Sequence, residues 1–347
     1  MPGAGGKHGT AAGGHRTRGE GDHMRQFNWT VAVLLVACLA GCGKATNEPD
    51  GATGSGAKGT IGVSVLTMTN PFFKTIADTI TEEAAAAGYA TTITSGEFDV
   101  AKQQNQVKDF IVAGCAAIVL CPCDSRSIGP AIAEANAAGI PVFTADIACL
   151  AEGVDVVSHI ASDNLGGGRL AAEAMIEALG DAGGEVVVLD FKQAESCLLR
   201  VQGFQEVVDA HNAEHPDQPV SIVAELPGDG KKDQGFKCTE DALQAHPNLA
   251  GIFAINDPSA LGARAALEKA GKADDVVIVG FDGQVDGRQA IKEGKVYADP
   301  VQFPDRIAEM TVDSIVRYFR GDEVATQQLI PCELYRQADA EADESLQ

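Results

Sequence analysis

From Thr60 onward, short runs of apolar and β-branched residues alternate with longer segments that have the apolar spacing of helices. The runs TIGVSVLTM (60–68), AAIVLCPC (116–123) and EVVVLDF (185–191) are typical examples. Continuous apolar runs of this kind are typical of parallel strands that are covered by helices on both faces. The alternation predicts a doubly wound α/β fold. Because the runs are too numerous for one open sheet, we expect two such lobes with parallel sheets.

The first 41 residues differ in character from the rest of the 347-residue chain. Residues 1–23 are rich in Gly, His and Arg and have no apolar periodicity, so we interpret them as a non-native upstream extension. Residues 24–41 combine Arg25 with the apolar run VAVLLVACLA, which is the pattern of a secretory signal peptide. A membrane-spanning helix needs roughly 20 apolar residues, so this run is too short to be one.

The signal peptide ends in the sequence Leu39-Ala40-Gly41-Cys42. Small residues before a cysteine at this place resemble a bacterial lipobox, which implies that Cys42 is lipidated and becomes the mature N-terminus. An ordinary signal peptide with a coincidental cysteine is the alternative. Residues 42–59 are rich in Gly, Ser, Thr and Asn, so we expect a flexible linker behind the lipid. The predicted location is the periplasm, on a membrane that holds the lipid anchor.

Charge and cysteine content exclude several classes of protein. The formal net charge is −23 with no basic stripe, which argues against a nucleic-acid partner. Of the nine cysteines, seven follow Cys42, and this odd number describes no simple disulfide framework. The pair in CPC (121–123) is too tight for the usual metal-binding spacing, and no other Cys/His pair completes a site. We therefore expect no metal and no cofactor.

The sequence also lacks a catalytic signature. No G-x-S-x-G elbow is present, and no histidine after Thr60 ends a strand next to a nucleophile. The glycine run 166–168 opens a helix and could cradle a phosphate, but it lacks the full fingerprint. The chain is therefore expected to be a binding protein and not an enzyme; an enzyme on the same fold is a minor alternative.

Open α/β sheets bind ligands at the carboxyl ends of their strands, so the residues at those ends are informative. To these we add Arg200, a cation near the start of an apolar helix, which needs a partner there or forms a surface salt bridge. The predicted ligand-binding side chains are Asn70, Phe72, Phe73, Asp146, Arg200, Asn256, Asp282 and Gln302. Asn70 is also a candidate helix N-cap, and Asp146 and Asp282 are also candidate turn residues.

The chemistry of this set indicates a neutral, polyhydroxylated ligand. Carboxylates, amides and a guanidinium satisfy the donor and acceptor capacity of hydroxyl groups. The C–H faces of a sugar ring pack against aromatic rings. The single tryptophan, Trp29, lies in the signal peptide. We therefore expect Phe72 and Phe73 to be exposed and to stack on the ring.

The same residues belong to motifs that follow one another along the chain: TNPFF (69–73), TAD (144–146), VVSHIASDN (156–164), RVQGF (200–204), AINDPSALGA (254–263), VGFDG (279–283) and PVQFPD (300–305). With them, the region from Thr60 to Gln337 resembles the periplasmic ribose-binding proteins, the substrate-binding components of bacterial ABC sugar importers. The resemblance implies two lobes that are joined by three crossovers and close on a monosaccharide by a hinge motion. It places the hinge at Ser162, Asp163 and Asn164, near 302–303 and near residue 330.

The resemblance implies lobe boundaries as well. The first lobe comprises residues 60–162 and 303–331, and the second comprises 163–302 and 332–347. The eight predicted side chains match ligand positions of the family, but the sequence departs from its ribose binders in two places. Ile147 follows Asp146 where they have an arginine, and the loop LPGDG (226–230) lacks their aromatic residue. We therefore predict a small sugar or polyol, and not ribose in particular.

The predicted function is capture of a monosaccharide, such as a ribose-like pentose, a hexose or a related polyol. A lipid-anchored monomer would deliver it to an ABC permease and its ATPase. A receptor that presents a sugar or sugar-like signal to a chemoreceptor or sensor kinase is the alternative. A repressor of the lactose-repressor type shares this fold, but it would carry a helix-turn-helix where this chain has a signal peptide and a linker.

Overall fold

The computed structural model describes residues 57–346, and Ser55–Gln347 form one compact unit. The predicted upstream extension, the signal peptide, Cys42 and most of the predicted linker lie outside the described residues. Between residues 57 and 346, no helix combines the length and the apolar character that crossing a bilayer requires.

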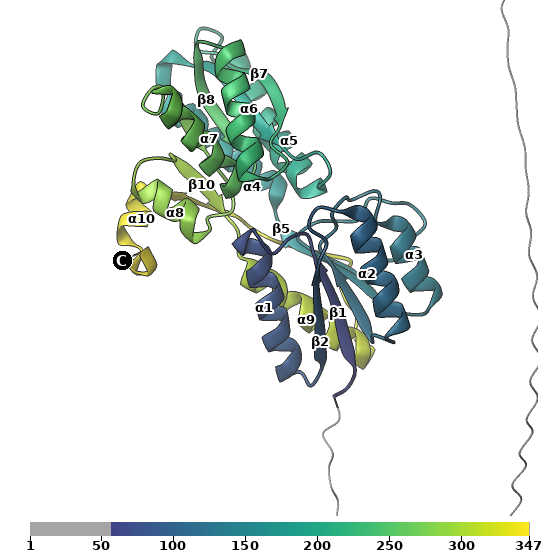
Figure 1. Ribbon diagram of the computed structural model, residues 1–347. Coiled ribbons are helices and arrows are strands. Elements are labelled where there is room, and N and C mark those ends of the chain that lie inside the picture. The colour runs from purple at the N-terminus through teal and green to yellow at the C-terminus, as the bar shows by residue number, and fades with distance from the viewer. Residues whose placement is uncertain (1–56, 347) are drawn as a thin grey trace, which may run out of the picture. The chain divides into compact units, whose positions relative to one another are not determined.

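The first lobe is built on a six-stranded parallel sheet with the strand order β11-β5-β4-β3-β1-β2. Its strands are β1 (Thr60–Val65), β2 (Ala90–Ser95), β3 (Ala117–Leu120), β4 (Val142–Ala145), β5 (Ser158–Ser162) and β11 (Gln327–Ile330). Helices cover both faces of the sheet, with α1 packed beside α9 and α2 beside α3 (Figure 1). These helices are α1 (Pro71–Ala86), α2 (Val100–Val112), α3 (Gly129–Ala137) and α9 (Pro304–Arg320).

The second lobe repeats this architecture with the strand order β12-β10-β9-β8-β6-β7. Its strands are β6 (Gly184–Asp190), β7 (Val220–Pro227), β8 (Leu249–Ala254), β9 (Val277–Val279), β10 (Ala298–Val301) and β12 (Glu333–Arg336), and only β12 is antiparallel to its neighbour. Its helices are α4 (Asn164–Leu179), α5 (Glu195–Glu214), α6 (Lys232–Ala245), α7 (Asp257–Ala270), α8 (Val285–Lys292) and α10 (Gln337–Ala342). Helix α4 packs against α5, and α6 packs against α7.

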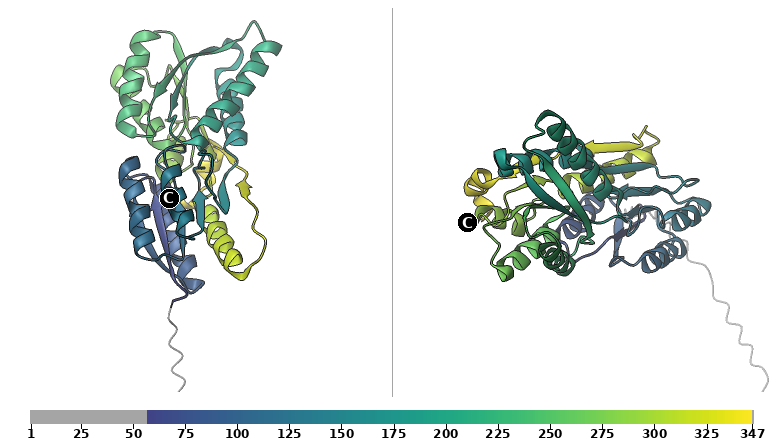
Figure 2. Two further views of the ribbon diagram at one scale, coloured as in Figure 1. Left: turned by 90° about the vertical axis from the view of Figure 1, so that its right-hand side faces the viewer. Right: turned by 90° about the horizontal axis from the view of Figure 1, so that it is seen from above.

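The chain passes between the lobes three times, and these crossovers confirm the predicted fold class. They lie between β5 and α4, between β10 and α9, and between β11 and β12. The last of them belongs to the yellow segment that follows α9 in Figure 2. The sequence patterns did not reveal β11 and β12, which are short strands at the edges of the two sheets.

A close approach of two helices explains part of the glycine run at the start of α4. A Cβ atom on Gly168 would lie 2.1 Å from the carbonyl oxygen of Arg200 in α5. A Cβ atom on Gly203 of α5 would lie 2.1 Å from the carbonyl oxygen of Leu165 in α4. The two helices therefore touch backbone to backbone, and only glycine at these two positions allows this contact. The spacing matters for the pocket described below because α5 carries Arg200.

We expect Gly203→Ala to destabilise the protein, because the new methyl group forces α4 and α5 apart. Overpacking of this kind typically costs about 1–3 kcal/mol in the free energy of unfolding. Denaturant unfolding checks the loss, with the exposed neighbour Gln202→Ala as the control. Equal stability of the two variants would contradict the backbone contact.

Candidate functional site

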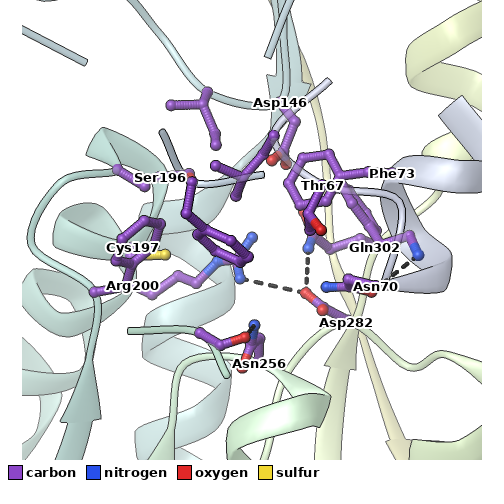
Figure 3. Close-up of a pocket in the computed structure, with 17 residues that line it drawn as sticks. Thr67, Asn70, Phe73, Asp146, Ser196, Cys197, Arg200, Asn256, Asp282 and Gln302 are labelled. Carbon is purple, nitrogen blue, oxygen red and sulfur yellow. Dashed lines mark hydrogen bonds and ion pairs between the residues drawn. The ribbon is translucent and has the colours of Figure 1, made fainter. Parts of the chain in front are cut away.

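All eight predicted side chains line one pocket between the two lobes (Figure 3). The cavity enclosed by these side chains is about 30 Å³, which is below the usual size range of small-molecule sites, so a ligand must widen it. The structure adds further lining residues: Leu66, Thr67, Phe98, Ile147, Phe191, Ala194, Ser196, Cys197 and Gly230. The geometry brings the predicted set together, and the ligand-binding role of each member stays a prediction.

Arg200 is the cation in the pocket wall, and its side chain is only 4% exposed. Its Nε donates to Asn164 Oδ1 at 2.8 Å, and its Nη1 donates to the Ile255 carbonyl oxygen at 2.7 Å and to Asp282 Oδ1 at 3.3 Å. The guanidinium also lies 4.0 Å from the centre of the Phe281 ring. This burial excludes the surface salt bridge, and the four partners compensate for the loss of water around the charge.

Asp282 connects Arg200 to the crossover that follows β10. Its backbone has a φ of 101°, which is the left-handed geometry expected for a turn residue, and its carboxylate is 2% exposed. Oδ1 accepts a 2.6 Å hydrogen bond from Gln302 Nε2 as well as the bond from Arg200. Burial raises the pKa of Asp282, although Arg200 and Gln302 oppose the rise. Asp282 therefore has both the turn role and a place in the pocket.

Two asparagines combine a capping role with a place in the pocket wall. Asn70 is the N-cap of α1, and its Oδ1 accepts from the Phe72 amide at 3.0 Å. Asn256 is the N-cap of α7, where its Oδ1 accepts from the Ser259 amide at 3.0 Å. Its Nδ2 donates to the Gly230 carbonyl oxygen at 3.1 Å. Capping fixes the position of each side-chain amide, so the N-termini of α1 and α7 hold these two polar groups of the pocket wall in place.

The expectation that Phe72 and Phe73 are exposed is wrong. Phe72 is 1% exposed and Phe73 is 5% exposed, and both belong to the hydrophobic core. Their rings meet edge to face, with centroids 5.2 Å apart and an interplanar angle of 85°. Helix geometry points neighbouring side chains in different directions. Both rings are therefore buried in the core, although both residues still line the pocket.

Asp146 lies on the opposite side of the pocket from Asp282 in Figure 3 and has the least satisfied polar group there. It follows β4 with a φ of 64°, is 3% exposed, and its Oδ1 has no hydrogen-bond partner among the described residues. Burial raises the pKa of Asp146 to about 7, while Arg200 lowers it and Asp282 raises it. The neighbouring Ile147 offers no compensating charge. A ligand that donates a hydrogen bond here would supply the missing partner.

Two aromatic rings of the pocket were missed at the level of sequence. Phe191 directly follows β6, so its place at a strand end was a usable signal. Phe98 follows β2 in a loop that carries no such signal. The rings meet with centroids 5.9 Å apart at an angle of 70°, although they belong to different lobes. The lobes are also joined by two 2.9 Å hydrogen bonds that Ser125 makes, with the Gln193 carbonyl oxygen and the Glu195 amide.

A second pair of carboxylates lies behind the pocket. Asp257, the first residue of α7, is 2% exposed, and Asp299 is fully buried. Asp257 Oδ2 accepts a 2.6 Å hydrogen bond from the Gln284 amide. Burial raises the pKa of both carboxyls, and repulsion from Asp299 raises that of Asp257 further. These groups add to the acidic character around Arg200 but do not line the pocket.

The described part of the chain, residues 57–346, has neither a metal-binding cluster nor a disulfide. No group of three or more His, Cys, Asp or Glu side chains in that span is arranged to hold a metal ion. The seven cysteines of that span are free thiols. Cys197 lines the pocket, where burial raises the pKa of its thiol to about 12, so it is a neutral wall group at physiological pH.

Two doubly wound lobes, three crossovers and a pocket lined from both sides are the architecture of two-lobed solute-binding proteins. Residues 61–323 match a sequence family described as the periplasmic binding protein domain, and the chain belongs to this family. It is 37% identical over 268 residues to the ribose import binding protein of Salmonella typhimurium, covering 77% of this chain and 87% of that protein.

Two further similar proteins are described with ligands other than ribose. The chain is 35% identical over 273 residues to a D-apiose import binding protein of Paraburkholderia graminis, covering 78% of this chain and 85% of the relative. It is 27% identical to an ABC transporter solute-binding protein of Bacillus halodurans, solved with bound myo-inositol. That comparison covers 85% of this chain and 100% of the other, with a TM-score of 0.74.

We expect Asp146→Asn to stabilise the ligand-free protein at pH 8. The folded state keeps the Asp146 proton up to about pH 7, whereas the unfolded chain loses it near pH 4. The folded state therefore binds more protons between these values, and stability falls as the pH rises through that window. Asparagine does not ionise, so it removes this pH-dependent loss of stability. The melting temperature of the variant should therefore be about 2 °C or more above that of the wild type at pH 8.

The difference between Asp146→Asn and the wild type should shrink towards pH 4, where both states of the wild type hold the proton. Thermal denaturation across this range measures it, with the exposed Asp78→Asn as the control. A stability difference that stays constant with pH would refute the assigned pKa.

Proposed function

We propose that the chain is a periplasmic solute-binding protein that captures a small neutral sugar or polyol and delivers it to an ABC importer. The observation that carries the proposal is the convergence of amide, carboxylate, guanidinium and aromatic side chains from both lobes on one pocket. Hydroxyl groups need both donors and acceptors, and the apolar C–H faces of a ring need aromatic contact. The pocket offers all three.

The named ligands of the relatives support this class of ligand. Ribose, D-apiose and myo-inositol are uncharged, compact and rich in hydroxyl groups. A pentose, a hexose or a cyclic polyol is therefore the ligand class that we assign to the pocket. Ile147, which stands where the ribose binders have an arginine, and the loop 226–230, which lacks their aromatic residue, argue against simple transfer of ribose to this chain.

The charge balance of the pocket further restricts the ligand class. Asp146 and Asp282 line the pocket with one cation, Arg200, which is already engaged by three acceptors and the Phe281 ring. An anionic ligand would bring another negative charge into a buried site that is already acidic. Sugar acids and sugar phosphates are therefore expected to bind poorly, and neutral polyhydroxylated rings are expected to bind well.

Closure of the lobes is the proposed mechanism. A ligand that contacts both lobes stabilises the closed form by its differential affinity for that form, and a permease can recognise the result. We assign the hinge to residues 162–164, of which Asn164 accepts a hydrogen bond from Arg200. A monomer is sufficient for this mechanism, with the permease and its ATPase as partners.

We further assign membrane attachment to lipidation of Cys42. In a bacterial host that processes the precursor, Cys42→Ser should convert a membrane-bound protein into one that is released from the membrane on cell fractionation. The interior thiol variant Cys238→Ser is the control and should stay with the membrane. Retention of Cys42→Ser in the membrane fraction would refute the lipid anchor without affecting the sugar-binding proposal.

A thermal-shift screen tests the ligand class. Residues 43–347 contain the whole compact unit but lack Trp29, so a dye must report unfolding. At 1 mM of a sugar with a micromolar dissociation constant, linkage predicts about 4 kcal/mol of stabilisation, which is a shift of many degrees. Neutral pentoses, hexoses and polyols should include a stabilising ligand, whereas the corresponding sugar acids should not. A flat response to the whole panel would refute the proposal.

Two variants test the site within the same screen. Asp146→Ala and Arg200→Ala should each abolish the ligand-induced shift, because each removes a polar group that faces the ligand from a different lobe. The exposed Asp78→Ala and Arg320→Ala are matched controls of the same residue types. Unchanged affinity in both pocket variants would overturn the site assignment even if a sugar is found to bind.

A further inference from the structure

Phe98 stands between the buried pocket and the outside of the molecule. It lines the pocket that holds Asp146 and Asp282, and it also lines a separate outer groove formed with Lys231, Lys232 and neighbouring residues. Phe98 is half-buried and contributes to the lining of both spaces. Phe98 is therefore placed at the mouth of the pocket.

The backbone around Phe98 holds the ring there at a conformational cost. Glu97 and Phe98 have φ values of 54° and 62°, which place two consecutive residues other than glycine in the left-handed region. The Glu97 carboxylate accepts hydrogen bonds from Thr67 Oγ1 at 3.1 Å, from the Met68 amide at 3.4 Å and from the Ser95 hydroxyl. Strain of this kind persists only where the surroundings enforce it, and such positions cluster at functional sites.

The partners of the Phe98 ring both come from the second lobe. Phe191 meets it edge to face at 5.9 Å, and the Lys231 ammonium lies 4.3 Å from its centre. Gly230, next to Lys231, leaves this part of the pocket without a side chain. A Cβ atom there would lie 3.1 Å from Asn256 Nδ2 and 3.8 Å from the Phe191 ring. The aromatic wall is thus assembled from Phe98 and Phe191.

We propose that Phe98 is the gate of the pocket. The first lobe presents its ring in a fixed position, and closure packs the ring against Phe191 and under Lys231, which seals the mouth and completes an aromatic wall for the ligand. The gate rests on the proposed function, because sealing matters only if the pocket takes up a ligand. If Phe98 only packed against its neighbours, it would not control access to the interior of the pocket, whereas a gate does.

Labelling of Cys197 measures that access directly and without any sugar. Cys197 lines the pocket behind the gate and is 6% exposed. We expect methyl methanethiosulfonate to label Cys197 about tenfold faster in Phe98→Ala than in the wild type, as followed by peptide mass spectrometry. Phe98→Leu, which keeps apolar bulk, should be intermediate. Phe319→Ala, which removes an exposed aromatic residue that does not line the pocket, should match the wild type.

Cys121, which is fully buried in the first lobe, reports global opening in the same samples. Faster labelling of Cys197 at an unchanged rate for Cys121 supports the gate. An unchanged rate for Cys197 in Phe98→Ala, or equal acceleration of both cysteines, overturns it.

A second experiment repeats the labelling of Cys197 in the presence of D-ribose, D-apiose or myo-inositol at saturating concentration. The gate predicts that whichever of these sugars protects Cys197 in the wild type protects it less in Phe98→Ala. Equal protection in both proteins overturns the gate. If none of the three protects wild-type Cys197, these sugars are excluded as ligands, while the sugar-free comparison still decides on the gate.

Discussion

The buried guanidinium of Arg200 is the interaction on which the rest of the pocket depends. It is the only lysine or arginine that is buried between residues 57 and 346, and a buried charge without partners is strongly destabilising. Its three acceptors belong to the first crossover, to the end of β8 and to the turn after β9. Satisfying one cation therefore fixes three segments relative to each other, and through Asp282 it also fixes Gln302 on the second crossover.

Much of this arrangement could be predicted from sequence, because topology determines where strand ends meet. Apolar runs that alternate with helices specify parallel sheets, and parallel strands bring their carboxyl ends to one edge. Asp146, Asn256 and Asp282 reach the same pocket for that reason. Strands β11 and β12 were missed because QQLI and ELYR form sheet edges, where most side chains remain partly exposed and the apolar signal is weak.

The details that sequence did not reveal depend on contacts between lobes or on unusual backbone geometry. Apolar spacing does not tell which rings an adjoining segment will cover, so the burial of Phe72 and Phe73 was not anticipated. Phe98 faces the second lobe because Glu97 and Phe98 adopt left-handed backbone angles, which residues other than glycine and asparagine rarely do. Its partners Phe191 and Lys231 are about 90 and 130 residues away along the chain.

The two departures from the ribose-binding pattern act together on the pocket. Without a cation at Ile147, the Asp146 carboxylate stays unsatisfied on one side, while Gln302 Oε1 also lacks a partner among the described residues. The pocket also has an apolar lining, which aromatic rings and the neutral thiol of Cys197 provide. A ligand that satisfies both acceptors needs hydrogen-bond donors such as hydroxyl groups, and apolar C–H faces would suit the rings. Neutral sugars and polyols have these groups, whereas an anionic solute adds charge to a pocket that already holds two carboxyl groups.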